Sequence, residues 1–303
     1  MVGQQNVVYH TTDGGHTLVE QYFTQSPDFT AAAGVSMFDA SSGVVVVLKF
    51  TTGGNTRSLL LWTNTGGASW HESIVPPAIA ALDPDLQDVF CSSARRVWIA
   101  GDAGTVLLSN DGGASFFDAD PFNVLGLVNL EAIAGLRIET RGAITGLPNE
   151  AKIAIVVGQN GKAFRYDAAS PVGSGSNPVG WSAIPVLRLD NTTFTGALHG
   201  VAMITHDLAY AAGDEGRVFR WTGAAFREVY QQSSRGPLWC VESVPGTSEV
   251  FAAGDDGVVV HFDGITWSEP KSNTSHPIYG LAYLSPASGW AIGRNNGLMR
   301  WEP

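Results

Sequence analysis

Residues 97–116 read VWIAGDAGTVLLSNDGGASF, and both kinds of turn that organise the rest of the chain occur in this stretch. Two apolar runs, 97–100 and 105–108, flank the tight turn Gly101-Asp102-Ala103-Gly104. Short β-rich runs separated by Gly/Asp turns predict a β-hairpin. The residues that follow, 109–116, fit the pattern S-x-D-x-G-x-x-aromatic. In such a turn the Asp side chain accepts hydrogen bonds from nearby backbone N–H groups, the glycine takes a positive φ and the aromatic side chain packs beneath the turn.

Both turns recur along the chain. The Gly-x-x-Gly turn returns at 158–161, 213–216, 254–257 and, in a stretched form, 293–297. The Asp-containing turn returns at 11–18, where the aromatic residue is missing, and at 63–70, where Thr65 replaces the Asp. Self-similarity at intervals of roughly 40–55 residues, with about four strands in each repeat, is typical of a β-propeller. The predicted fold class is therefore all-β.

The repeats resemble the BNR/Asp-box repeat family, and within it they look most like the photosystem II stability/assembly factor type, whose repeats run GWAIG…G…STDGGKTW. The run Gly289-Trp290-Ala291-Ile292-Gly293 and the 109–116 turn carry this resemblance, which covers nearly the whole chain. It implies a propeller scaffold with a docking or assembly role. The residues to which we assign a structural role in the Asp-box turns are Thr11, Asp13, Gly15, Ser109, Asp111, Gly113 and Phe116.

The strand pattern predicts a single β-propeller domain over residues 1–303, built of four-stranded blades. Six inner hairpins are found, so six blades are favoured, and seven remain possible. The expected blades span 34–75, 86–118, 128–186, 198–230, 238–269 and 278–301. The sixth blade lacks an outer strand and the N-terminus has one to spare, so we expect an N-terminal strand to close the ring. One further third-strand segment is then left without a blade.

Two residue types give predictions about the core. Cys91 and Cys240 fall in the inner strands of the second and fifth blades, which are opposite one another in a six-bladed ring. A disulfide needs a much shorter Cα–Cα distance than that, so both are predicted to be free, buried thiols. The nine tryptophans mostly recur at equivalent positions of the blades, so we expect them to belong to the hydrophobic core.

The charge of the chain limits its partners. The 28 Asp and Glu outnumber the 17 Lys and Arg, the net charge is -11, and no basic run occurs. Nucleic acid is therefore not expected as a partner, whereas a basic protein or a cation fits. No apolar run reaches the length of a membrane-spanning helix. No signal peptide is visible, so the compartment is unknown, with the cytoplasm or a virion expected unless the sequence begins inside a longer protein.

The acidic turns predict a binding surface at one end of the blades. In antiparallel blades the turns between second and third strands share a face with the connections between blades, and propellers usually present ligands there. The binding residues predicted on this face are Asp102, Asp214, Glu215, Asp255, Asp256 and Arg294. An alternative is that Asp merely suits these turns and keeps the surface soluble. Two insertions in the third blade, 139–151 and 167–180, are a second place where a partner could bind.

Motifs of known enzymes are absent from the sequence. There is no G-x-S-x-G, no H-E-x-x-H and no cysteine pair with zinc spacing. The Arg-Ile-Pro signature of sialidases is matched only in part, by Arg137-Ile138-Glu139. We therefore predict no catalytic residue, no metal and no cofactor. The function predicted is a non-enzymatic protein-binding or assembly scaffold. The alternatives are a structural component of a virion or surface assembly, which would self-associate, and a glycan-binding or sialidase-like protein.

Overall fold

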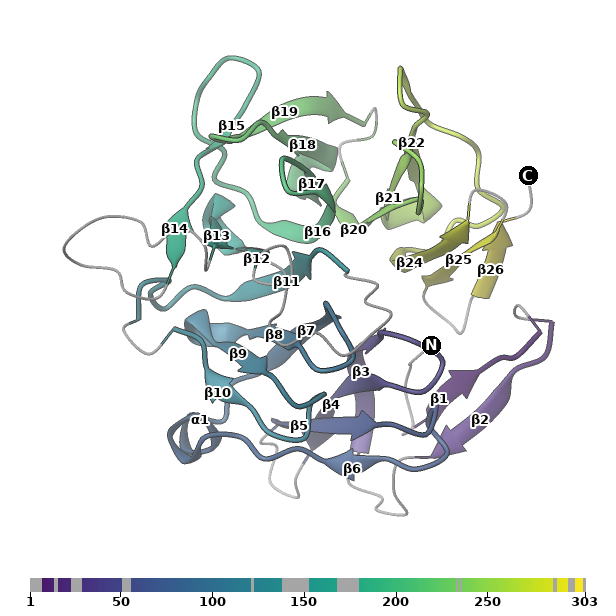
Figure 1. Cartoon of the computed structure of the whole chain (residues 1–303). Helices are drawn as coiled ribbons and strands as arrows, with labels where there is room; N and C mark the ends of the chain where they lie inside the picture. Colours follow the sequence, from purple (N-terminus) through teal and green to yellow (C-terminus); the bar gives the residue numbers. More distant parts are fainter. Residues whose placement is uncertain are drawn as a thin grey trace. The chain divides into compact units, whose positions relative to one another are not determined.

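The structure, a computed structural model, is built almost entirely of β-strands (Figure 1). It describes residues 7–13, 16–22, 29–50, 56–120, 123–137, 153–167, 180–232, 234, 236–285, 288–293 and 298–301. The chain forms two compact units. Unit 1 comprises Met1–Ala154 and Tyr166–Ser182, and unit 2 comprises Ile155–Arg165 and Ala183–Pro303.

Unit 1 holds two complete four-stranded antiparallel sheets whose strands follow chain order. The first is β3 (Phe29–Met37), β4 (Gly43–Phe50), β5 (Thr56–Thr63) and β6 (His71–Glu72). The second is β7 (Leu86–Cys91), β8 (Val97–Gly101), β9 (Val106–Ser109) and β10 (Phe117–Asp118). The hairpin of β1 (Val7–His10) and β2 (Val19–Tyr22) forms a separate two-stranded sheet.

A third four-stranded sheet and the three sheets of unit 2 repeat this order. The third consists of β11 (Leu130–Gly135), β12 (Ile153–Gly158), β13 (Ala163–Asp167) and β14 (Trp181–Ala183). The first sheet of unit 2 contains β16 (Leu198–Thr205), β17 (Leu208–Gly213), β18 (Arg217–Trp221) and β19 (Phe226–Gln231). The second contains β20 (Leu238–Ser243), β21 (Val250–Gly254), β22 (Val259–Phe262) and β23 (Trp267–Ser268). The last contains β24 (Ile278–Ser285), β25 (Ser288–Gly293) and β26 (Leu298–Trp301).

The fold is a six-bladed β-propeller with four-stranded antiparallel blades, as the sequence predicted. Most strands fall within the blade limits expected from the turns, but β3 begins at Phe29, ahead of the expected limit at residue 34, and β19 ends one residue beyond residue 230. The fourth sheet carries an additional strand, β15 (Val186–Leu187), which pairs in parallel with β19 and was not predicted. Among the described residues β26 is the third strand of its sheet and β2 pairs with β1, so closure of the ring by an N-terminal strand stays a prediction. That residues 1–303 form a single domain also stays a prediction.

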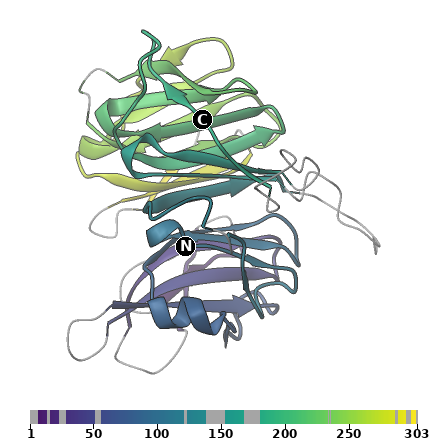
Figure 2. The same ribbon diagram turned by 90° about the vertical axis from the view of Figure 1, so that its left-hand side faces the viewer.

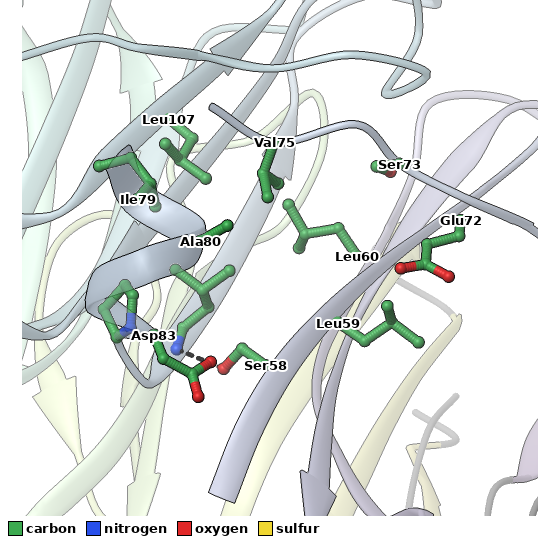
Figure 3. Close-up of a pocket in the computed structure, with 12 residues that line it drawn as sticks. Ser58, Leu59, Leu60, Glu72, Ser73, Val75, Ile79, Ala80, Asp83 and Leu107 are labelled. Carbon is green, nitrogen blue, oxygen red and sulfur yellow. Dashed lines mark hydrogen bonds between the residues drawn. The ribbon is translucent and has the colours of Figure 1, made fainter. Parts of the chain in front are cut away.

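Helix α1 (Pro77–Leu82) connects the two sheets of unit 1. It lies in front of the strands of unit 1 in Figure 2 and buries none of its residues completely. Its last turn ends at Asp83, which is left-handed with φ of 50° and donates its N–H to the carbonyl of Ile79. The helix forms one side of a pocket in this unit (Figure 3). No helix of the described residues is long and apolar enough to span a membrane.

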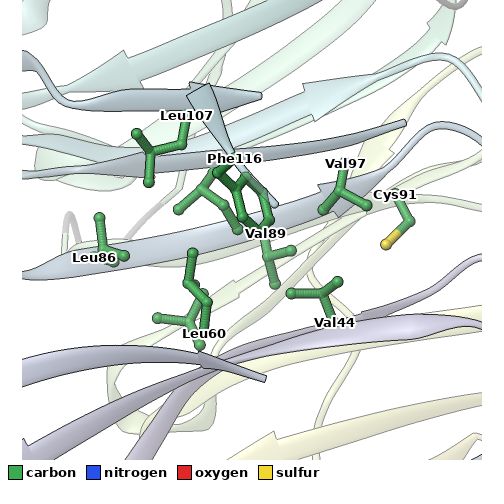
Figure 4. Packing of buried hydrophobic residues seen from close by; sticks show 10 residues of the cluster. Val44, Leu60, Leu86, Val89, Cys91, Val97, Leu107 and Phe116 are labelled. Atoms are coloured by element: carbon green, nitrogen blue, oxygen red, sulfur yellow. The ribbon is translucent and has the colours of Figure 1, made fainter. Parts of the chain in front are cut away.

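The core of unit 1 lies between its two sheets. Strand β7 contacts both β3 and β4, and Val44, Leu60, Leu107 and Phe116 meet in one buried cluster (Figure 4). Residues 44–47 are four valines, all completely buried. A strand that is covered on both faces is expected to be apolar throughout rather than alternating, and this run is an example. Phe116, the aromatic residue of the 109–116 turn, is buried in the cluster, as predicted.

The two cysteines lie in the strands where the sequence placed them, Cys91 in β7 and Cys240 in β20. Both are free. Cys91 is buried, and burial raises the pKa of its thiol to about 11. Cys240 is only half-buried, and it follows the bulge of β20. The prediction of two free thiols is therefore confirmed, and that of complete burial is confirmed for Cys91 alone.

Candidate functional site

The Gly-x-x-Gly turns share one backbone conformation. In the four turns that the structure describes, the third residue is left-handed, with φ of 54° at Ala103, 57° at Asn160, 58° at Glu215 and 56° at Asp256. The fourth residue is a glycine with positive φ, as the left-handed conformation favours. At Gly104 a Cβ would also overlap the carbonyl oxygen of Gly126. The repetition gives the second residue of every turn the same position relative to its own hairpin.

Four inner strands, β7, β16, β20 and β24, are bulged at their second residue. The register shifts lie between Leu86 and Asp88 in β7, Leu198 and Gly200 in β16, Leu238 and Cys240 in β20, and Ile278 and Gly280 in β24. A bulge leaves one residue out of the hydrogen-bonding ladder and re-aims its side chain. The bulged residues are Gln87, His199, Trp239 and Tyr279.

In unit 2 two of the predicted carboxylates bond to bulged residues. Oδ1 of Asp214 lies 3.0 Å from Nε2 of His199, and Oδ2 accepts a hydrogen bond of 2.8 Å from the backbone N–H of Ala197. Oδ1 of Asp255 accepts a hydrogen bond of 2.7 Å from Nε1 of Trp239. These contacts fix the carboxylates in one direction relative to the inner strands.

The same bulged residues form a row of rings across the inner strands of unit 2. The ring centroids of His199 and Trp239 are 4.4 Å apart, and those of Trp239 and Tyr279 are 6.1 Å apart. The strands that carry them approach closely, since a Cβ on Gly200 would lie 2.9 Å from the N of Val241. The His199 side chain is 9% exposed and Tyr279 is 50% exposed. We refer to His199, Trp239, Tyr279, Asp214 and Asp255 as the turn face of unit 2.

Glu215 has a different environment from its neighbour Asp214. Its carboxylate oxygens lie 3.0 Å from Nη2 of Arg188 and 2.8 Å from Nε of Arg217. Arg217 also pairs with the buried carboxylate of Glu228. Burial alone would lower the pKa of Arg217, but its hydrogen bond to Glu215 and the charge of Glu228 raise it. Glu215 therefore holds a chain of ion pairs inside unit 2, in addition to any role at the surface.

The remaining predicted binding residues are separate from this group. Asp102 lies in unit 1, where its Oδ1 accepts a hydrogen bond of 3.3 Å from Nε2 of Gln87. Its pKa is raised, chiefly by burial and also by the charges of Asp85 and Glu131. Asp256 is exposed on its turn. Arg294 lies outside the described residues.

The Asp-box turns use their carboxylates internally. Oδ1 of Asp111 accepts hydrogen bonds from Oγ of Ser109 (2.7 Å) and N of Ser115 (2.9 Å), and Oδ2 accepts one from Oγ of Ser115 (2.5 Å). Asp13 makes the corresponding bonds with Thr11 and with N and Oγ1 of Thr17. Gly113 has a φ of 97° and donates its N–H to Ser109, whereas Gly15 lies outside the described residues.

These hydrogen bonds lower the pKa of both aspartates. For Asp111, burial would raise the pKa, but the hydrogen bonds from Ser115 and Ser109 lower it. The hydrogen bonds from Thr17 hold the pKa of Asp13 well below its usual range. Within the described ranges of the chain, no group of three or more His, Cys, Asp or Glu residues could hold a metal ion.

Comparison with known proteins agrees with this geometry at the level of the fold. No protein-family model and no curated protein matches the sequence. The structure is similar to that of YCF48 bound to D1 peptide, with a TM-score of 0.69 and 16% identity over 100% of this chain and 87% of the other. It is also similar to YCF48 from Cyanidioschyzon merolae, with a TM-score of 0.65 and 15% identity over 100% and 90% of the two chains. What is shared is the propeller fold.

Sequence reasoning found the carboxylates of the turn face but missed its rings. Trp239 was expected in the core, yet it is only half-buried. A signal was present, because each inner strand begins with an apolar residue followed by one that differs from blade to blade, as in Leu198-His199 and Leu238-Trp239. The bulge that turns this second residue toward the Asp comes from strand pairing, which the local pattern does not encode.

Proposed function

We propose that the protein is a non-enzymatic binding propeller, and that the turn face of unit 2 holds a segment of a partner protein. The observation that carries this proposal is the row of His199, Trp239 and Tyr279, with a carboxylate fixed beside each of the first two. Aromatic side chains with a polar tip are enriched in protein interfaces, because they bury a large area at a low cost in side-chain entropy.

The chemistry of the turn face favours a basic segment. Asp214 and Asp255 are oriented before any partner binds, which reduces the ordering cost of binding. A Lys or Arg side chain could lie over an exposed ring and contribute a cation–π interaction, while pairing with one of the carboxylates. The net charge of -11 would steer such a segment toward the protein.

Two further findings support the proposal. A structure with the same fold, YCF48 bound to D1 peptide, is a propeller in complex with a peptide. The repeats of the sequence resemble those of photosystem II assembly factors, which implies docking rather than catalysis. Both bear on the kind of function, and neither identifies a partner for this chain.

The test is selection of a random peptide display library on the purified protein, followed by calorimetric titration of the enriched peptides. We expect Lys or Arg near an apolar residue in the selected sequences, and binding that weakens with added salt. Trp239→Ala and Tyr279→Ala should each lower the affinity at least about tenfold. Phe117→Ala, which removes an exposed aromatic ring from β10 in unit 1, should leave it unchanged.

Other outcomes would contradict the proposal or favour its alternatives. Selected peptides that bind Trp239→Ala and Tyr279→Ala as well as the parent protein would exclude the turn face of unit 2 as the site. A stable oligomer in light scattering would favour a structural assembly role. Turnover of a fluorogenic sialoside would favour the sialidase-like alternative.

A further inference from the structure

A pocket of about 220 Å³ lies in unit 1, between α1, β5 and the start of β7 (Figure 3). Pockets that take drug-sized molecules usually measure roughly 300–1,000 Å³, so this one has the size for a single side chain or a small fragment. It is separate from the turn face of unit 2, since every residue that lines it belongs to unit 1.

The floor of the pocket is continuous with the core of unit 1. Leu60, Leu86 and Leu107 line the pocket and also belong to the buried cluster between the two sheets. Val75 and Ile79, which line it from the other side, pack against that cluster as well. An apolar group that enters the pocket would therefore meet side chains that are already held in place.

Ser73 gives the pocket a polar feature that the fold leaves unused. This residue is 9% exposed, it lines the pocket, and its Oγ has no hydrogen-bond partner in the part of the chain that the structure describes. Buried hydroxyl groups normally have a partner. The oxygen itself is buried, so the Ser73 side chain would have to rotate before it could bond to a group in the pocket.

Two carboxylates lie at the edges of the pocket, and exposed apolar residues stand next in the chain to residues that line it. Ile74 and Leu82 are 73% and 74% exposed, and each is next in the chain to a residue that lines the pocket. The backbone around Ile74 is fixed, because its N–H bonds to Ala114 and its carbonyl accepts from Phe116. Glu72 and Asp83 lie on opposite sides of the pocket in Figure 3.

We propose that this pocket docks an apolar side chain of a partner protein, and that basic residues on either side of that side chain pair with Glu72 and Asp83. The pocket has apolar side chains at its floor and carboxylates at its edges, and an anchor side chain in a preformed pocket with charges around it is the usual arrangement of an interface hot spot. Two carboxylates at opposite edges are complementary to a segment in which basic residues flank the anchor. The overall charge of -11 adds to the attraction.

The first test is a methyl-NMR titration of the whole protein with the peptide acetyl-Lys-Ser-Leu-Ser-Lys-amide. The methyl signals of Leu60, Leu107, Val75 and Ile79 should shift, and that of Ile265, an exposed residue of unit 2, should not. Peptides with Glu in place of both Lys, or with Ser in place of Leu, should bind at least about tenfold more weakly. Equal shifts with all three peptides, or no shift of the pocket methyls, would overturn the proposal.

Matched variants locate the binding. Ala80→Phe puts a ring at the mouth of the pocket and should abolish the shifts, while Ala78→Phe, on the same helix but not lining the pocket, should preserve them. Glu72→Gln and Asp83→Asn should each weaken binding severalfold; Asn tolerates the left-handed conformation of residue 83. If Ala80→Phe and Ala78→Phe have the same effect on binding while both keep the parent near-UV spectrum, the pocket is not the docking site.

Discussion

Two kinds of turn in this propeller carry an aspartate, and they use it in opposite ways. In the Asp-box turn, both oxygens of Asp111 bond to Ser109 and Ser115 within the turn itself. In the Gly-x-x-Gly turns, Asp214 and Asp255 reach to side chains of a neighbouring strand, His199 and Trp239. An aspartate bonded by its own turn stabilises the fold locally, whereas one bonded to a bulged residue helps to shape a surface.

A further aspartate, Asp88 on β7, extends the comparison to a carboxylate that joins two blades. Its Oδ1 accepts from N of Val89 and its Oδ2 from N of Ile133 on β11. Burial raises its pKa from 3.8 to about 6, although both hydrogen bonds lower it. Because the folded-state pKa exceeds the unfolded one, this group should make the unfolding free energy fall by about 2 to 3 kcal/mol as the pH rises from about 4 to 6.

Urea unfolding at a series of pH values measures this effect. Asp88→Asn cannot titrate, so its unfolding free energy should lack this fall between about pH 4 and 6, whatever its absolute stability. All other titrating groups are common to both proteins and cancel in the difference. Parallel pH profiles for the two proteins would show that the pKa of Asp88 is not raised.

Asp111→Ala tests the first half of the comparison. The change removes a charged acceptor from three hydrogen bonds and should lower the unfolding free energy by about 2 kcal/mol. The control is Asp256→Asn, at an exposed, left-handed position that Asn tolerates, with an expected change within about 0.5 kcal/mol. Equal losses in urea unfolding for both variants would mean that the Asp-box bonds contribute little to stability.

Asp255→Asn tests the second half. It keeps an acceptor for Nε1 of Trp239 and removes the charge, so the unfolding free energy should change by less than about 1 kcal/mol. Binding of selected basic peptides should nevertheless weaken at least about tenfold. A variant that lost stability but kept its peptide affinity would place Asp255 with Asp111 instead of with the surface group.

The smallest effect is expected at Thr65, which takes the place of the Asp in the second copy of the motif. Its Oγ1 already accepts from N of Ser69, at 2.9 Å, as Asp111 accepts from Ser115. Oγ1 of Thr65 also lies 3.0 Å from Oγ of Ser69. Thr65→Asp provides two charged oxygens for the bonds that one hydroxyl now shares, and should raise the unfolding free energy by about 0.5 kcal/mol. Thermal unfolding would show this as a slightly higher midpoint, and a lower one would mean that the turns are not equivalent.

The sequence predicted the blades because their signals are local. The glycines of the 101–104 turn and the valines of 44–47 specify turns and buried strands without knowledge of the rest of the chain. The turn face of unit 2 was only half predictable. Its carboxylates follow from the turn motif, but the orientation of Trp239 depends on a bulge formed by pairing with β21. The ion pair between Glu215 and Arg188 likewise depends on where the segment before β16 lies.

Strand β15 has a consequence for how molecules of this protein meet one another. It pairs in parallel with β19, and N of Phe226 also bonds to the carbonyl of Pro185, at 2.9 Å. Arg227 and Asn191 add a side-chain bond of 2.7 Å nearby. The backbone groups of β19 that would otherwise face outward are thus partly occupied, and an edge in this state is a poor template for a strand from another molecule. The fourth sheet is protected against edge-to-edge aggregation by two residues of its own chain.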